Sequence, residues 1–277
     1  MRSVTDRTAS GALVWSLVRA NDVGWWSAQT VGGLLAGGAL LLGFAGWERR
    51  APAPMVPLGL FRSPAFAAGN LATFLMSGAT FAAAFWVTQE FQYARGYSPV
   101  STGLRLLPFF ATPMVISPLA GALSDRIGRR RIMVTGLALQ AVGFAWVAAR
   151  GSLSAGWVEL VIALSVAGVG ISMALPTVPT AVLNAVTTPL LGKASGVNYM
   201  AQRFGAVFAV AIGTAVFSAY GSLGTPESVT AGFRPALWSS AVFAALAALA
   251  ALAIPAPARR STPEPARPDA LVASGKQ

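Results

Sequence analysis

The sequence consists of long apolar runs separated by short polar segments. The apolar runs cover residues 28–47, 66–88, 102–123, 132–149, 157–183, 194–219 and 236–254. Each is close to the length of about 20 residues that a helix needs to cross a bilayer. None shows the alternation of apolar and polar residues that is typical of a membrane-spanning strand. The pattern therefore predicts an all-α, polytopic membrane protein with about seven transmembrane helices.

The amino-acid composition excludes several classes of protein and of functional site. The chain has 277 residues, of which 55% are hydrophobic and 10% charged, and its mean hydropathy is +0.63. Soluble domains usually carry about 25% charged residues, so a soluble enzyme is excluded. Cysteine and histidine are both absent, which excludes disulfides, thiolate or imidazole metal sites and Ser-His-Asp triads. With no nucleophile–base pair visible, the sequence does not predict an enzyme.

The segments that flank the predicted helices are more polar. Residues 1–27 contain the short apolar stretch Gly11–Val18, which we interpret as an N-terminal stub and loop; its insertion in the membrane stays open. Residues 48–65 are expected to form a cytoplasmic linker. Residues 255–277 are rich in Pro, Ala and charged residues and are expected to form a disordered cytoplasmic tail.

The net charge of +11 is explained by the distribution of Lys and Arg. These residues lie between the apolar runs, where membrane proteins keep them on the cytoplasmic side. One set of loops contains Arg49, Arg50, Arg62, Arg126, Arg129, Arg130, Arg131, Lys193, Arg259, Arg260, Arg267 and Lys276, and the alternate loops contain only Arg19, Arg95, Arg150 and Arg234. The asymmetry predicts an inner-membrane protein with a cytoplasmic C-terminus and no nucleic-acid partner.

Several polar residues fall within or beside the apolar runs, where charges are costly and usually face a cavity or the bundle interior. The candidate cavity or coupling residues are Asn70, Thr73, Glu90, Arg105, Asn198, Gln202 and Arg203. We expect Arg105 and Glu90 to pair across neighbouring helices. The alternative is that Glu90, Arg105 and Glu159 reach the outer interface and that Arg203 reaches the cytoplasmic one. For Asn70, Thr73, Asn198 and Gln202 the alternative is interhelical hydrogen bonding.

Two further sets of residues have both a functional and a packing interpretation. An aromatic, adaptable wall for a drug could be formed by Trp86, Phe109, Phe110 and Met114, which could instead face lipid or pack in the bundle. Small residues spaced by four permit close helix approach. Such pairs are Gly33 with Gly37, and Gly192 with Gly196.

The most specific motif lies between the third and fourth runs. It reads Gly121-Ala-Leu-Ser-Asp125-Arg126-Ile-Gly128-Arg-Arg-Arg131. Gly121 permits a tight helix contact, and Gly128 permits a chain reversal. Asp125 is placed to pair with Arg126 or Arg129, or to cap the following helix.

This motif resembles the loop signature of the major facilitator superfamily, although Ser124 stands where that family often has Ala. The resemblance implies a charged loop that locks one conformation and releases another. Its residues here are Gly121, Asp125, Arg126, Gly128, Arg129 and Arg130.

A finer resemblance, to the fourteen-helix drug:proton antiporters of that superfamily, extends over residues 11–254. It is carried by four segments in the expected order: Leu13–Trp25, Glu48–Arg62, Gly96–Pro108 and Ala194–Asn198. The resemblance implies that residues 66–254 form the C-terminal six-helix half and that residues 28–47 form a linker transmembrane helix. It also implies a small amphipathic or cationic drug-like substrate and protons as partners, with no cofactor, because the proton gradient supplies the energy.

The resemblance leaves the N-terminal half of such a transporter unaccounted for. Alternating access needs two halves that move around a site between them. Three interpretations stay open: a fragment that is inactive without an N-terminal half, a half-transporter that works as a homo- or heterodimer, and a non-transporting regulatory membrane protein. The sequence does not name the substrate, the oligomeric state or the proton stoichiometry.

Overall fold

The computed structural model describes residues 57–150 and 156–255, together with isolated positions at 35, 39, 43 and 46–48. The side chain of Asp125 is not among the described parts. The N-terminal stub, almost all of the linker helix expected at residues 28–47, and the tail after residue 255 lie outside the described residues.

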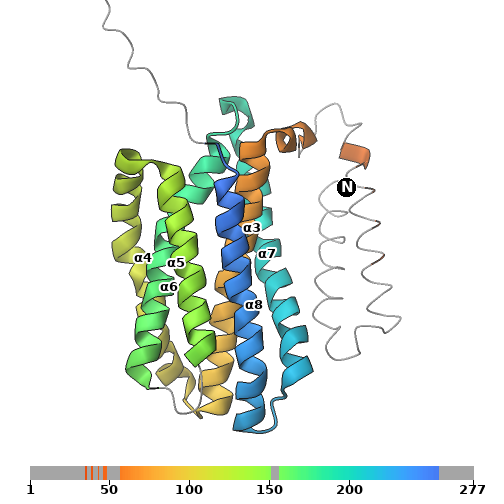
Figure 1. The fold of residues 1–277 in the computed structure, drawn as a ribbon. Helices are drawn as coiled ribbons and strands as arrows, with labels where there is room; N and C mark the ends of the chain where they lie inside the picture. The colour runs from red at the N-terminus through yellow and green to blue at the C-terminus, as the bar shows by residue number, and fades with distance from the viewer. Residues whose placement is uncertain are drawn as a thin grey trace, which may run out of the picture.

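Six long helices make up the described part of the chain (Figure 1). They are α3 (Pro64–Gln89), α4 (Pro99–Ile127), α5 (Arg129–Arg150), α6 (Trp157–Leu183), α7 (Leu191–Tyr220) and α8 (Pro226–Leu252). The π-helical turn η2 (Glu90–Ala94) continues α3, and the short 3-10 helices η1 (Leu58–Arg62) and η3 (Thr188–Leu190) precede α3 and α7. All six long helices are apolar enough to cross a membrane, which confirms the predicted all-α membrane architecture.

The helix bounds match the apolar runs most closely at α6 and least closely at α8. The run that predicts α8 begins at residue 236, but the helix begins at Pro226. Its N-cap is Thr225, whose hydroxyl accepts a hydrogen bond of 3.3 Å from the Ser228 N–H. Capping residues and a proline in the first turn favour a helix start without being apolar. A search for apolar runs therefore misses the polar first turns of this helix.

The packing of the helices has an internal two-fold pattern. The contacts of α5 with α6 correspond to those of α8 with α3, and the contacts of α3 with α7 correspond to those of α6 with α4. If helices α3, α4 and α5 are exchanged with α6, α7 and α8, the α5–α6 contact becomes the α8–α3 contact and the α3–α7 contact becomes the α6–α4 contact. The contact between α5 and α8 is unchanged by the exchange. Inverted three-helix repeats of this kind build many membrane transporter folds.

Glycines allow the backbones of α5 and α6 to touch. A Cβ atom on Gly170 would lie 2.3 Å from the Gln140 amide nitrogen, and one on Gly143 would lie 2.5 Å from the Ala167 nitrogen. The pair expected from spacing behaves differently, since a Cβ on Gly192 or Gly196 would meet no atom within 4 Å. That expectation is wrong for the described residues, because spacing does not specify which helix face meets a neighbour. Gly33 and Gly37 lie outside the described residues.

Two arginines cap the ends of the antiparallel helices α5 and α8 reciprocally. Arg130, in the first turn of α5, donates a hydrogen bond to the Leu252 carbonyl at the end of α8. Arg234, near the start of α8, donates to the carbonyls of Ala148 and Ala149 at 3.2 and 3.3 Å. The last carbonyls of a helix lack partners within the helix, and a cation there also interacts favourably with the helix dipole.

Replacing Arg234 with Gln should lower the stability of the folded chain. The shorter, neutral side chain leaves the last carbonyls of α5 without a charged donor, at a cost of about 1 kcal/mol. The measurement is thermal unfolding of the detergent-solubilised protein. Arg131→Gln is the matched control, because Arg131 is exposed. Equal unfolding temperatures for the two variants would contradict a capping role for Arg234.

Candidate functional site

Three of the candidate cavity residues meet between α3 and α7. The Asn198 amide nitrogen donates to the Thr73 hydroxyl at 2.8 Å and to the Asn70 side-chain oxygen at 3.3 Å. All three side chains are buried. The structure therefore has the interhelical hydrogen bonds that the sequence left as one of two interpretations.

The other two candidates on α7 do not join this cluster. The Arg203 guanidinium donates to the Tyr199 hydroxyl at 2.7 Å and lies 4.8 Å from the centroid of its ring. Both partners are on the exposed side of the same helix. Gln202 is half-buried and forms no hydrogen bond with Asn70, Thr73 or Asn198.

Glu90 lies at the opposite end of α3, on the π-helical turn η2, and is only 2% exposed. Its carboxylate accepts a hydrogen bond of 3.2 Å from the Thr230 hydroxyl on α8. Arg95, at the end of the same turn, interacts with it electrostatically. Isolated π-helical turns occur frequently at functional sites, so this buried carboxyl is a candidate for a functional role.

The expected pair of Arg105 with Glu90 is wrong. The Arg105 guanidinium carbon lies 4.0 Å from the centroid of the Tyr97 ring and 5.4 Å from that of Trp157. It also donates to the Ser101 carbonyl at 3.2 Å. Attraction between a cation and aromatic rings stabilises this arrangement, and Glu90 interacts with Thr230 and Arg95 instead.

An ion pair does form at this end of the bundle, between neighbouring helices. Arg150 at the end of α5 donates to Glu159 at the start of α6, with 2.6 Å between Nε and Oε1. Both side chains are accessible to solvent. Glu159 therefore lies at an end of the bundle, as the interface interpretation expects, and the side of the membrane that this end faces stays a prediction.

The four residues of the expected aromatic wall are divided between the core and the surface. Trp86 and Phe109 are buried, and Trp86 stacks on Phe217 with ring centroids 4.9 Å apart. Phe110 and Met114, on α4, are 53% and 81% exposed. The wall does not form within the described part of the chain, because the core packing of α3 and α4 turns the two pairs of side chains apart.

The signature loop is a very short connection between α4 and α5. The two helices are separated only by Gly128, whose φ of +97° lies in a region that favours glycine. The chain reversal predicted at Gly128 is therefore confirmed. Gly121 makes no tight contact, since a Cβ there would meet no described atom within 4 Å. Asp125 lies in the last turn of α4 and not at the N-cap of α5, because α4 continues to Ile127.

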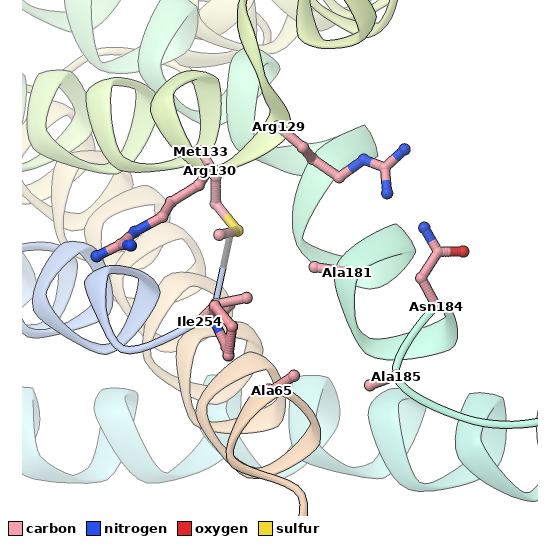
Figure 2. A pocket seen from close by; sticks show the side chains of 9 residues that line it. Ala65, Arg129, Arg130, Met133, Ala181, Asn184, Ala185 and Ile254 are labelled. Atoms are coloured by element: carbon pink, nitrogen blue, oxygen red, sulfur yellow. The ribbon is translucent and has the colours of Figure 1, made fainter. Parts of the chain in front are cut away.

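A pocket lies beside this loop, where α3 and α5 begin and α6 and α8 end (Figure 2). Its volume is about 150 Å³, and it is lined by Ala65, Arg129, Arg130, Met133, Ala181, Asn184, Ala185, Ile254 and Pro255. The predicted loop residues Arg129 and Arg130 contribute its charges. The contribution of Asn184 was not predicted, because a polar residue at the end of an apolar run is an ordinary feature of a sequence.

The described basic residues gather at the pocket end of the bundle. Those at or near this end are Arg62, Arg126, Arg129, Arg130, Arg131 and Lys193, those toward the other end are Arg95, Arg105, Arg150 and Arg234, and Arg203 lies within α7. Pairing of Asp125 with Arg126 or Arg129 stays a prediction, because the Asp125 side chain is not described.

Comparison with known proteins identifies relatives among exporters. The chain is similar to the multidrug resistance protein Stp of Mycobacterium tuberculosis, with 31% identity over 76% of this chain and 39% of that protein. It is also similar to the tetracenomycin C resistance and export protein of Streptomyces glaucescens, with 30% identity over 74% of this chain and 37% of the relative. The multidrug efflux pump LfrA of Mycolicibacterium smegmatis is 27% identical over 90% of this chain and 49% of its own length.

The chain thus spans between about two fifths and one half of the length of these relatives. The profile of the Major Facilitator Superfamily matches residues 68–275, which include all of α4 to α8 and most of α3. The match, the six apolar helices and the loop signature agree with one another. The chain is an integral membrane protein that belongs to the Major Facilitator Superfamily.

Proposed function

We propose that this chain supplies the C-terminal six-helix half of a proton-coupled multidrug efflux antiporter. The observation that carries the proposal is the similarity to drug and antibiotic exporters over 74% to 90% of the chain. The substrate is a small amphipathic or cationic drug, exchanged for protons. Transport by a six-helix half requires a second half, because alternating access moves two halves around the substrate.

The proposed partner surface comprises the exposed faces of α4 and α7. Only 17% of the α4 span and 28% of the α7 span are buried, against 50–61% of the other four spans. Exposed apolar side chains on α4 include Leu104, Leu107 and Met114. Because α4 and α7 correspond to each other in the internal two-fold pattern, their faces are equivalent places for a partner half to pack.

Co-expression tests this function directly. The chain is produced in cells that lack their own drug pumps, alone and together with the N-terminal half of the Stp relative, and drug accumulation is measured. We expect accumulation to fall only when both halves are present and co-purify. Co-purification without any fall in accumulation would contradict the transport function.

The same experiment separates the alternatives. A homodimeric half-transporter would lower drug accumulation when the chain is expressed alone. A regulatory protein would co-purify with an intact exporter and change that exporter's activity without transporting drug itself. The fragment interpretation, in which the chain is inactive alone, requires that neither occurs.

We also propose that the loop between α4 and α5 acts as a conformational switch, with Asp125 as its acidic member. Asp125→Asn in the co-expressed pair should reduce efflux several-fold, because conformational coupling energies are typically about 1–3 kcal/mol. Glu227→Asn is a control for a lost carboxylate, since Glu227 is exposed at the other end of the bundle. Unchanged efflux with Asp125→Asn would remove the loop from the switching mechanism.

The proposed orientation places the pocket end and the C-terminus in the cytoplasm. The chain has no cysteine, so single-cysteine variants have no labelling background from the chain itself. A membrane-impermeant maleimide applied to intact cells should label Glu227→Cys and leave Arg131→Cys unlabelled until the membrane is opened. Both positions are exposed, and the opposite labelling pattern would reverse the orientation.

A further inference from the structure

The pocket beside the signature loop is basic in the part of the chain that the structure describes. Its lining contains Arg129, Arg130 and the amide side chain of Asn184, and no acidic residue. Arg130 donates to the neutral Leu252 carbonyl and forms no ion pair with a carboxylate in the described part of the chain. The side chains of Arg129 and Asn184 form no hydrogen bond with a described side chain. Figure 2 shows both side chains reaching from α5 and from the end of α6 toward the same space.

The rest of the pocket is apolar. Its walls include Met133, Ala181 and Ile254, whose side chains have no hydrogen-bond donor. An exposed apolar ridge on α8, formed by Val242, Leu246 and Leu249, leads along the helix to Leu252, the residue whose carbonyl binds Arg130. Charged donors at a helix end next to apolar surface suit a ligand with an anionic head and a hydrocarbon tail.

We propose that this pocket binds the phosphate of an anionic phospholipid, with the acyl chains along the apolar surface of α8. Arginine binds phosphate oxygens with parallel, charge-assisted hydrogen bonds, and Asn184 supplies a further donor. Zwitterionic lipids carry the same phosphate together with a cationic group, which two arginines repel. The inference rests on the proposed function only in assigning the pocket to the cytoplasmic side of the membrane. Lipid binding itself requires neither a partner half nor transport.

The test is native mass spectrometry of the full chain in detergent, titrated with phosphatidylglycerol or with phosphatidylcholine of the same acyl chains. Wild-type protein should retain phosphatidylglycerol about tenfold more tightly. Arg129→Gln should reduce that preference by about tenfold, the usual size of one lost charge-assisted hydrogen bond. Arg131→Gln is the matched control, because Arg131 lies in the same basic run but does not line the pocket, and it should leave the preference unchanged.

A second variant keeps the test decisive if Arg129→Gln does not fold. Asn184→Ala removes a donor from an exposed position and should reduce phosphatidylglycerol binding several-fold. Equal retention of both lipids, or equal losses for Arg129→Gln and Arg131→Gln, would overturn the proposal. A parallel titration with millimolar inorganic phosphate distinguishes a lipid headgroup from free phosphate as the bound anion. Binding of phosphate alone, with no lipid preference, would make this a free-anion site and would also overturn the phospholipid assignment.

Discussion

Replacing Gly170 with Ala should destabilise the bundle, although the substitution adds only a methyl group. A Cβ atom at this position would lie 2.3 Å from the Gln140 nitrogen and 2.5 Å from the Gly136 carbonyl oxygen. Both are backbone atoms, so α5 and α6 must move apart. Overpacking of this kind costs about 1–3 kcal/mol. The separation also strains the buried Gln140, whose amide donates to the Thr80 hydroxyl on α3 at 2.7 Å.

The loss of stability is measured by heating the detergent-solubilised protein and using size-exclusion chromatography to determine how much folded protein remains. Gly196→Ala is the matched control, because a Cβ there would meet no described atom within 4 Å. Alanine is favoured over glycine inside a helix by about 1 kcal/mol, so the control should be as stable as the wild-type protein or more stable. The same added methyl group is therefore expected to lower the stability at position 170 and to leave it unchanged or raise it at position 196. Equal stability of both variants would mean that the α5–α6 contact can open at no cost.

Glu90→Gln should remove most of the proton-driven drug efflux of the assembled transporter, by about 100-fold or more, the typical contribution of a group that transfers protons. This prediction rests on the proposed function and on the place of Glu90, a buried carboxyl at the end of α3. Glutamine keeps the shape of the side chain and an oxygen that can accept from Thr230, but it cannot release or bind a proton. The expected result is a folded protein whose efflux no longer responds to the pH gradient.

The measurement is efflux of a fluorescent cationic drug from cells that express both halves, at several external pH values. Glu227→Gln is the control, because Glu227 is an exposed acid at the same end of the bundle. Glu90→Gln should unfold at the wild-type temperature or above it, since replacing a buried charge with a neutral group often stabilises a protein. Unchanged, pH-dependent efflux would contradict a proton-carrying role for Glu90, and loss of the folded protein would indicate a purely structural one.

The sequence predicted the membrane class and the six described helices because these depend on local properties. Transfer of a 20-residue segment into a bilayer depends on that segment's own composition. The reversal at Gly128 was also local, since a positive φ at a one-residue connection requires glycine there. The loop signature and the order of the other matching segments similarly sufficed to predict the superfamily.

Contacts between helices were predicted less well. Three of the four polar residues that were grouped, Asn70, Thr73 and Asn198, do bond to one another, because polar groups in apolar helices form hydrogen bonds between helices. Gln202, the fourth, does not join them. The pairing of Arg105 with Glu90 failed. The aromatic rings of Tyr97 and Trp157 are far apart in the sequence, and only the packing of α4 against α6 brings them to the same guanidinium.

The sequence by itself therefore determined the class of the protein, its helices and its superfamily, because hydropathy, turn chemistry and motif spacing are properties of short segments. Tertiary structure decided which glycines lie at helix contacts, where Glu90 finds its partner, and that Arg129 and Asn184 face one pocket. Each of these depends on the crossing angle and the axial offset of two helices. Those quantities follow from the packing of whole helix surfaces, and no single segment of the sequence contains them.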